Sequence, residues 1–422
     1  MTDVQLATPS TLGEGRAPPP APRGKAAYLM SRFPKLTETF VLNEMQAVER
    51  EGWEVVICPL QRERTSVMHP DAEPYVRRAW FTPLLSWRFL GSHLRYLRRK
   101  PRVYLSTLWT LLRANFGSLR YFAGAVAFFP KAVHLARLLE RGVVEHVHAH
   151  FASHPAMAAL VIHRLTDIPF SFTAHGSDLH RDRHMLREKV AEASAVVAIS
   201  RYNRNVILDE CGEKYAGKVV VIHCGVDVSV FQPRSGPTPF DRGDGPLNVL
   251  CIGSLHEVKG QTHLIDACRR LRERGVEFTC HLVGDGPDRK RLQWQIERAG
   301  LTERVHLHGG QPREQVRRRL QSADVLAAPS VPSRDGRREG IPVVLMEAMA
   351  SGVPVVASDL SGIPELAEHG TTGLLIPPGD SAALTDALRR LHDDAELRQA
   401  LARNGRRRVE ERFDLYQNAR AL

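Results

Sequence analysis

Short apolar runs alternate with stretches of helical spacing along almost the whole chain. Six runs fall in the N-terminal half and six in the C-terminal half: KAAYLMS, WEVVICPL, VEHVHAHF, IPFSFTAHG, ASAVVAIS and KVVVIHCG, then LNVLCIGS, EFTCHLVGDG, RVHLHGG, ADVLAAPS, VPVVAS and GLLIP. A helical stretch from about Thr37 to Glu51 separates the first two. Apolar strands that alternate with amphipathic helices are typical of parallel sheets with helices on both faces. The pattern predicts an α/β protein with doubly wound sheets.

A joint rich in proline and glycine, VFQPRSGPTPFDRGDGP, separates the two series of runs. Two such series predict two domains. Ligands of doubly wound sheets bind at the carboxyl ends of the strands, so we expect a ligand cleft between the domains. The predicted units are a disordered leader, an N-terminal domain, a linker, a C-terminal domain and a C-terminal helix with the option of packing back on the first domain: residues 1–24, 25–232, 233–246, 247–400 and 401–422.

The length of 422 residues and a hydrophobic content of 43% suit two globular cores. The leader is rich in proline and glycine, so we expect disorder rather than a signal peptide. No apolar run in the sequence reaches the roughly 18 residues that a membrane span needs. The six cysteines form no CxxC pair, which is typical of reduced, buried cysteines in a bacterial-type cytoplasm: Cys58, Cys211, Cys224, Cys251, Cys268 and Cys280.

The net charge of +11 comes from one part of the chain. Between Pro74 and Leu139 there is no aspartate or glutamate, but there are twelve lysines or arginines. Within this segment, residues 87–122 mix arginine with tryptophan, leucine and phenylalanine at helical spacing. We therefore predict a basic amphipathic helical segment at 84–141 that lies peripherally on an anionic membrane. Helices packed on the domain with basic outer faces are the alternative, and no base-stacking or groove-reading feature indicates nucleic-acid binding.

Two glutamates, Glu339 and Glu347, stand eight positions apart in REGIPVVLMEAMASGVPVVAS. Proline is favoured in a first helical turn, so this stretch predicts a helix from about Pro342 to Ala350 that stops at Gly352. Eight residues of helix rise roughly 12 Å, whereas a retaining glycosidase holds its carboxylates about 5 Å apart. An extended ligand with polar groups at both ends therefore fits better than a hydrolase substrate.

A sugar nucleotide is such a ligand, with sugar hydroxyls at one end, a ribose diol at the other and a diphosphate between them. A carboxylate can accept two hydrogen bonds from one diol. The helix N-terminus adds a partial positive charge and N–H donors for the diphosphate, here from Gly340, Ile341 and Val343. For the two acids alone, a buried helix with incidental glutamates is the alternative.

The surrounding residues carry further motifs. EGIPVVLMEAMASGVPVVASDLSGIPELAEHGTTGLLIPPGD resembles the donor-binding motif of family-4 retaining glycosyltransferases, which have the GT-B fold of two Rossmann-like domains facing across a cleft. SRFPKLTETFVLNEM, HAHFASHPAMAAL, FTAHGSDL and KVVVIHCGVDVSVFQP resemble the N-terminal half of the subgroup that builds bacterial exopolysaccharide of the colanic-acid kind. The similarity covers roughly residues 26 to 415. It implies an acceptor-side N-terminal domain and a nucleotide-sugar-binding C-terminal domain.

The resemblance implies roles for three charged residues. Glu347 matches the glutamate that binds the ribose hydroxyls, and Glu339 matches the one that faces the donor sugar. Lys259, in GSLHEVKG, matches the lysine that holds the diphosphate and offsets charge on the leaving nucleotide. The family generally works without metal, and the sequence has no paired-aspartate metal motif where one would be needed. By itself, Lys259 is equally a solvated lysine ahead of a helix.

One position departs from the family pattern. Ser254 stands where the family usually carries an arginine, so one of two expected cations beside the diphosphate is missing. Three arginines just upstream of Glu339 are candidate replacements: Arg334, Arg337 and Arg338. Without a replacement we expect weak donor affinity or a less usual donor.

His175, in FTAHGSDL, follows a predicted strand at its cleft-facing end. The resemblance places this histidine beside the donor sugar, near the reacting carbon. Asp178 is expected to cap the next helix, with a contact to the acceptor as the alternative. His148, His150 and His154 stay unassigned, because their spacing suits packing and capping as well as a metal cluster, and we expect no metal.

The segment RFPKLTETF follows the first strand, where many related enzymes have a glycine-rich loop. Four of its residues are expected near the donor phosphate or the acceptor: Phe33, Pro34, Thr37 and Glu38. Thr37 is also a candidate N-cap. VGDGPDR resembles a dinucleotide fingerprint only weakly, and Gly284 and Gly286 are expected to let backbone approach the nucleotide.

Together these features predict a metal-independent retaining hexosyltransferase without a cofactor. It would move a hexose from a UDP- or GDP-linked sugar to a lipid-linked oligosaccharide or other glycan, on the inner face of the cytoplasmic membrane. The leaving phosphate would assist the attacking hydroxyl, so no protein base is assigned. A nucleotide-sugar epimerase or a glycan phosphorylase would share the fold, and a catalytically degenerate partner protein is the non-enzymatic alternative.

Overall fold

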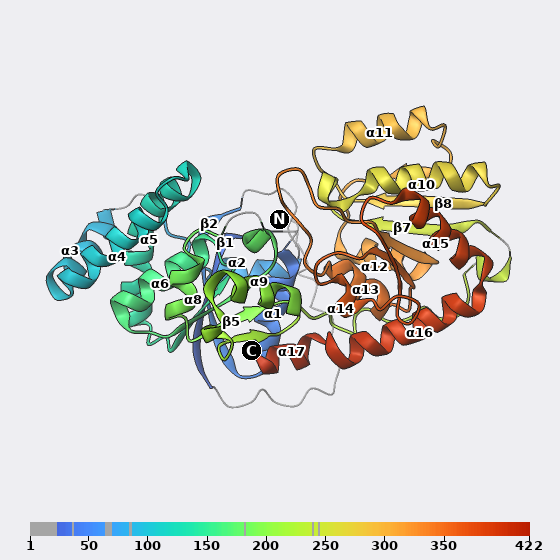
Figure 1. Ribbon diagram of the computed structural model, residues 1–422. Coiled ribbons are helices and arrows are strands. Elements are labelled where there is room, and N and C mark those ends of the chain that lie inside the picture. Colours follow the sequence, from blue (N-terminus) through green and yellow to red (C-terminus); the bar gives the residue numbers. More distant parts are fainter. Residues whose placement is uncertain are drawn as a thin grey trace, which may run out of the picture.

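The computed structural model contains two α/β domains side by side (Figure 1). The described residues are 23–35, 38–63, 70–83, 87–180, 183–238, 240–243 and 245–422. The expected disordered leader lies outside them up to residue 22, and so does Thr37. Gly24, the last residue of that predicted leader, is already the first residue of β1.

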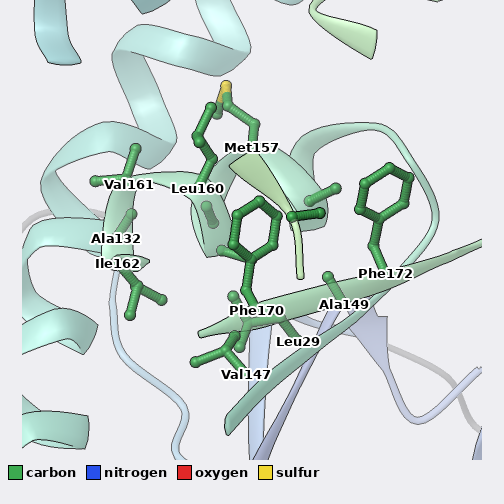
Figure 2. Packing of buried hydrophobic residues seen from close by; sticks show 14 of the residues in the cluster. Leu29, Ala132, Val147, Ala149, Met157, Leu160, Val161, Ile162, Phe170 and Phe172 are labelled. Carbon is green, nitrogen blue, oxygen red and sulfur yellow. The ribbon is translucent and has the colours of Figure 1, made fainter. Parts of the chain in front are cut away.

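The N-terminal domain is built on a six-stranded parallel sheet in the order β2-β1-β3-β4-β5-β6. Its strands are β1 (Gly24–Phe33), β2 (Trp53–Arg62), β3 (His146–His150), β4 (Phe170–Ala174), β5 (Ala195–Ala198) and β6 (Val219–Val221). Side chains of β1 alternate between two cores, with Leu29 in one and Tyr28 and Met30 in the other. Figure 2 shows the first core, where Phe170 lies close to Met157. Because both faces are covered, the strands read as near-continuous apolar runs.

The helices of this domain outside the segment between β2 and β3 alternate with the strands, as the pattern predicted. They are α1 (Thr39–Arg50), α6 (His154–Thr166), α7 (Ser177–His180), α8 (Leu186–Glu192) and α9 (Arg201–Cys211). The first of them starts two residues later than predicted, and Glu38 holds its N-cap position without a side-chain capping bond.

The C-terminal domain is also built on a six-stranded parallel sheet, in the order β12-β11-β10-β7-β8-β9. Its strands are β7 (Leu247–Ile252), β8 (Phe278–Val283), β9 (Val305–Leu307), β10 (Val325–Ala328), β11 (Val355–Ser358) and β12 (Leu374–Ile376). Its first helices are α10 (Gln261–Glu273), α11 (Arg289–Arg298), α12 (Arg313–Ser322), α13 (Val343–Ala350), α14 (Ile363–Leu366) and α15 (Ser381–Asp393). Val249 and Leu250 of β7 again point into different cores. Both sheets are parallel, which confirms the predicted fold class of two doubly wound domains.

The acid-poor segment folds into helices at the outer end of the N-terminal domain (Figure 1). After α2 (Glu73–Arg78) come α3 (Trp87–Arg99), α4 (Pro101–Ala114) and α5 (Leu119–Arg141), which we call the helical arm. With 23 residues, α5 is long and apolar enough to cross a membrane by length and composition, which corrects our expectation. Its Phe129, Val133 and Leu135 are buried in the domain core, so it packs as a core helix.

The C-terminus consists of two helices, α16 (Ala395–Arg412) and α17 (Leu415–Ala421), where we predicted one from residue 401. The break has a local cause, because Asp414 accepts hydrogen bonds from the N–H groups of Tyr416 and Gln417 and thereby starts a new helix. Leu415 and Ala419 of α17 pack in the same core cluster as α1. The chain end therefore returns to the N-terminal domain (Figure 1).

Candidate active site

Two loops meet where the domains touch, and both follow the carboxyl end of a strand. His175 and Gly176 follow β4, and Arg338 to Gly340 follow β10 and lead into α13. A Cβ atom on Gly340 would lie 2.6 Å from the carbonyl oxygen of His175. A Cβ atom on Gly176 would lie 3.4 Å from the amide nitrogen of Gly340. Only glycine fits at 340, because any side chain would force the two loops apart.

The helix α13 starts at this contact. It begins at Val343 with Pro342 as the N-cap residue, one position later than predicted, and it ends before Gly352, whose φ is 69°. In the part of the chain that the structure describes, the amide groups of Gly340, Ile341 and Val343 donate to no protein acceptor. These amides and the helix dipole make the N-terminus of α13 a suitable site for an anion.

Glu347 lies one turn into α13, between buried neighbours on both sides. Burial raises the pKa of its carboxyl group to about 7, and Arg313 only partly opposes this effect. Among the described residues, none forms a hydrogen bond or ion pair with this carboxylate. A desolvated carboxylate without a partner is costly, so its surroundings favour a ligand that donates hydrogen bonds.

Glu339 and Lys259 form an ion pair, with Lys259 Nζ 2.8 Å from Glu339 Oε2. Lys259 ends the short helix Glu257–Lys259 after β7, and its stem lies over Gly253, whose Cβ position would be 3.2 Å from Lys259 Cδ. The two side chains are 21% and 18% exposed, which lets a ligand reach them. The structure thus brings together the lysine and the sugar-side glutamate that the sequence predicted.

The three arginines considered as replacements for the missing cation at Ser254 contact other groups of the protein. Ser254 is exposed, and each of the three candidate arginines has another partner. Arg334 approaches Glu257 at 3.5 Å, Arg337 pairs with Asp335 at 2.6 Å, and Arg338 donates to Tyr202 Oη at 3.3 Å.

The glycines of the β8–α11 turn pack closely against another loop. A Cβ atom on Gly284 would lie 1.9 Å from the oxygen of Gly253, and one on Gly286 would lie 2.3 Å from the oxygen of Leu255. These glycines let the turn pack against the loop that carries Ser254. Close packing between two protein loops explains them, so they carry no evidence for backbone contact with a nucleotide.

His175 is enclosed by other rings. Its ring centroid lies 4.8 Å from that of Phe40 and 4.6 Å from that of Phe151, and its Nε2 lies 3.1 Å from His150 Nδ1. Burial, with a smaller contribution from His150, holds the pKa of His175 well below its usual value. The imidazole is therefore neutral at pH 7.

Asp178 neither caps a helix with its side chain nor faces an open surface. Its buried carboxylate accepts hydrogen bonds from the N–H groups of Ala152 at 2.6 Å, His175 at 3.1 Å and Gly176 at 2.7 Å. It therefore ties the loop after β3 to the loop after β4. This role replaces both options that we considered from the sequence.

Of the four residues of the segment after β1 that were expected near the donor phosphate or the acceptor, those that the structure describes contact their own domain. Phe33 is buried in the core with α1 and β2, and Glu38 pairs with Lys35. Pro34 follows a cis peptide bond and is buried. Phe40, the last residue of the same segment, contacts the His175 ring, so the segment contributes both to the core of the N-terminal domain and to the surroundings of His175. Thr37 lies outside the described residues.

Two of the three unassigned histidines, His148 and His150, lie side by side, with ring centroids 5.1 Å apart. His148 lies between the hydroxyls of Ser171 and Thr173, at 2.8 and 2.9 Å. His154 instead stacks on Tyr121 with a centroid distance of 5.1 Å. The structure therefore groups His148 with His150 and leaves His154 out of that group.

Sequence reasoning missed one cross-domain contact. Glu365, in α14 of the C-terminal domain, accepts hydrogen bonds from the N–H groups of Arg201 at 2.9 Å and Tyr202 at 3.1 Å. These groups are at the N-terminus of α9 in the other domain, and His223 Nε2 lies 3.2 Å from the same carboxylate. Glu365 belongs to GIPEL, which in the sequence carried only the resemblance to the family.

Two family models match the chain. Residues 37–230 match "Glycosyltransferase Family 4", and residues 239–408 match "Glycosyl transferases group 1". A Salmonella typhimurium protein, "Putative colanic acid biosynthesis glycosyltransferase WcaL", is 31% identical over 382 residues, which cover 86% of this chain and 89% of the relative. The chain belongs to this glycosyltransferase family. The Erwinia amylovora "Amylovoran biosynthesis glycosyltransferase AmsK" is 30% identical and matches 87% of this chain and 90% of its own.

Solved structures share the fold at lower identity. Anabaena Alr3699/HepE in complex with UDP superposes with a TM-score of 0.70 at 20% identity, covering 94% of this chain and 98% of its own. Sucrose-phosphate synthase from Thermosynechococcus elongatus gives a TM-score of 0.67 at 19% identity and covers 94% and 97%. These neighbours are GT-B glycosyltransferases, so the predicted GT-B fold is confirmed.

Proposed function

We propose that this glycosyltransferase moves a hexose from a nucleotide-diphosphate sugar to a lipid-linked glycan, with retention, in exopolysaccharide or cell-envelope polysaccharide synthesis. One observation carries the proposal. The helix α13 has free N–H groups at its start, the Lys259–Glu339 pair beside them and a partnerless, desolvated Glu347 one turn further on. The names of the colanic-acid and amylovoran relatives support the polysaccharide assignment.

The donor would lie along this helix. Its diphosphate would accept hydrogen bonds from the α13 amides and pair with Lys259, which offsets the charge that builds on the leaving nucleotide. Glu347 would accept both ribose hydroxyls, and Glu339 would turn from Lys259 to the hydroxyls of the sugar. A neighbour of the same fold was solved with UDP, which supports a nucleotide donor, and UDP- and GDP-sugars both remain candidates.

The proposed chemistry needs no metal ion, because Lys259 and the helix N-terminus supply positive charge where the leaving group forms. His175 is neutral and faces other rings, so we assign it a place beside the sugar rather than the role of a base. The leaving phosphate would take the proton of the attacking hydroxyl on the same face of the sugar, which gives retention.

We also propose that the helical arm rests on the anionic inner face of the cytoplasmic membrane. Several of its large apolar side chains are exposed: Trp87, Leu90, Leu94, Leu97, Leu105, Trp109, Phe116 and Leu119. Exposed arginines stand among them, such as Arg98, Arg99 and Arg102. Apolar side chains that enter the interface beside cations that meet headgroups are typical of peripheral membrane helices. Such a surface would bring the site near a lipid-linked acceptor.

Nucleotide release from a panel of UDP- and GDP-sugars, with and without a lipid extract, tests the transfer reaction. We expect release that depends on the extract and is lost in Glu339→Ala but not in Glu411→Ala, an exposed acid of α16. A changed sugar still on its nucleotide would indicate an epimerase, and phosphate-dependent glycan breakdown a phosphorylase. No turnover with any donor, together with normal cell polysaccharide in Glu339→Ala, would indicate a degenerate partner protein.

A further inference from the structure

A chain of polar side chains runs from the interior of the N-terminal domain to His175. Glu44 of α1 places its Oε1 3.2 Å from Nε2 of His150, the last residue of β3. Nδ1 of His150 lies 3.1 Å from Nε2 of His175, and the two rings stack with centroids 5.3 Å apart. Three residues that are far apart in the sequence therefore form one continuous path.

Water has little access to this path. His150 is fully buried and His175 is 8% exposed. Among the described residues His150 Nε2 makes no well-aligned hydrogen bond, and Glu44 Oε1, at 3.2 Å, is the acceptor that lies beside it. Although burial pushes the pKa of Glu44 upward, His150, His148 and the hydroxyl of Tyr28 together hold it below its usual value, so the carboxylate is ionised.

The ring nitrogens that carry protons in His150 and His175 follow from which of their neighbours can donate or accept a hydrogen bond. An ionised carboxylate only accepts, so His150 must carry its proton on Nε2. The single-proton form of His150 accepts at Nδ1, and His175 then supplies the proton from its own Nε2. Nδ1 of His175 is left with a free lone pair, and its nearest polar neighbour given by the structure is the thiol of Cys224 at 4.0 Å, a weak donor.

We infer that Glu44 and His150 are positioning residues that hold His175 in the Nε2–H tautomer, so that Nδ1 can accept a hydrogen bond from a hydroxyl of the donor sugar. The inference rests on the proposed function for its substrate class. The tautomer itself is a property of the free protein and does not depend on that function. Neither Glu44 nor His150 was expected to matter for the site from the sequence.

A divalent cation is the competing occupant of this region. Ligand atoms of Glu44, His148 and His150 all lie within 4.8 Å of one another. The hydroxyls of Ser171 and Thr173, however, already contact both ring nitrogens of His148. Both nitrogens of His148 therefore have partners without an ion, which favours the chain. His150 Nε2 has only the distance contact with Glu44, so we keep the metal as an outcome of the test.

Nitrogen-15 NMR of histidine-labelled full-length protein at pH 7.5 tests the tautomer directly. The His175 signals are those missing from His175→Asn. We expect a protonated Nε2 and an unprotonated Nδ1 on His175 in the wild type, without any donor present. An Nδ1–H tautomer or an even mixture in the wild type would overturn the inference.

Paired variants separate positioning from mere packing. Glutamine can still accept the proton of His150, so Glu44→Gln should keep the tautomer, whereas Glu44→Leu and His150→Asn should scramble it. His146→Asn is the matched control, because His146 lies on the same strand and the same face but bonds to Ser171 instead. A His175 tautomer that is unchanged in Glu44→Leu would contradict the chain.

Kinetics add a second readout. We expect kcat/KM for nucleotide-sugar turnover to fall by about 10- to 100-fold in Glu44→Leu, as when a histidine loses its orienting partner, and to recover largely in Glu44→Gln. Stoichiometric zinc in the purified wild type that is lost in both Glu44 variants would establish the metal site instead. The wild type and the variants could all fail to turn over any donor while His175 shows the expected tautomer. That result would contradict the proposed function but support the Glu44–His150–His175 path.

Discussion

The surroundings of Glu347 favour a ligand that donates hydrogen bonds to its carboxylate. Its side chain in α13 is half-buried, desolvation raises the pKa of its carboxyl group to about 7, and it has no hydrogen-bonding partner within the described structure. A ribose diol would donate two hydrogen bonds to the ionised form and would therefore lower this pKa on binding. Binding and ionisation are then linked, so the pH dependence of affinity reports on the contact.

We expect the affinity for a nucleotide sugar to rise with pH until Glu347 is ionised. A pKa of about 7 means that affinity falls by about ten-fold between pH 8 and pH 6. Calorimetry with UDP- and GDP-sugars measures this, because their diphosphates do not titrate in the range. Glu347→Gln should bind more weakly and should show a flat profile. A flat profile in the wild type would contradict the role of Glu347.

A substitution at Ser254 can test the site by adding a positive charge rather than by removing a side chain. The residue is exposed at the end of β7, five positions before Lys259, and the nearby arginines have other partners. We expect Ser254→Arg to bind nucleoside diphosphates several-fold more tightly, because a second cation would face the diphosphate. Thr302→Arg, at another exposed position of the same domain, is the control for added net charge. Equal gains in both variants would show that the position has no special relation to the ligand.

At the scale of elements, the helical arm differs from the other surface helices in what it exposes. Its inner side is anchored by buried Tyr96, Tyr104 and Leu111, while Trp87 is 91% exposed and Trp109 is 66% exposed. Deleting the arm would therefore also remove core residues. Point substitutions on the outer side test membrane binding without that complication.

We expect replacement of Trp87, Trp109 and Phe116 by serine to reduce partition onto vesicles that contain anionic lipid. Salt should weaken the binding of the wild type, because the arginines act over about a Debye length. Sedimentation with vesicles measures both effects. Trp294→Ser is the matched control, since Trp294 is 57% exposed on α11 of the other domain. Unchanged partition of the triple variant would contradict membrane docking by the arm.

At the scale of the whole molecule, the two domains are in contact through backbone as well as side chains. Gly340 abuts the carbonyl group of His175, and Glu365 accepts the N–H groups at the start of α9. The return of α17 to the N-terminal domain adds a second connection. The relative position of the domains therefore depends on a few close contacts at the candidate site.

We expect Gly340→Ala to lower turnover by at least ten-fold while both domains stay folded, because its Cβ atom would meet the His175 oxygen at 2.6 Å and move the reacting groups apart. Gly310→Ala is the control, since the position of its Cβ atom is open. Circular dichroism and donor turnover together measure the result. Normal turnover in Gly340→Ala would show that the contact is not needed for activity.

The sequence predicted the fold well for a physical reason. Strands that are covered on both faces must be apolar at nearly every position, so runs such as FSFTA in β4 are visible without any structure. The helix α13 was placed within one residue, because Pro342 and Gly352 mark its two ends.

The site was harder to predict, because its contacts depend on which loops meet. Phe33 follows a strand end in the sequence just as His175 does, but only the packing of α1 shows that it belongs to a core. Gly284 looked like a nucleotide contact until its neighbour proved to be Gly253. Glu44 and His150 are separated by more than a hundred positions, so no local pattern could pair them.

A crystal structure with a bound nucleoside diphosphate would test the central claim most directly. We predict that the diphosphate lies at the start of α13 next to Lys259, with both ribose hydroxyls within about 3.2 Å of the Glu347 carboxylate. A nucleotide bound elsewhere, or a ribose out of reach of Glu347, would contradict it.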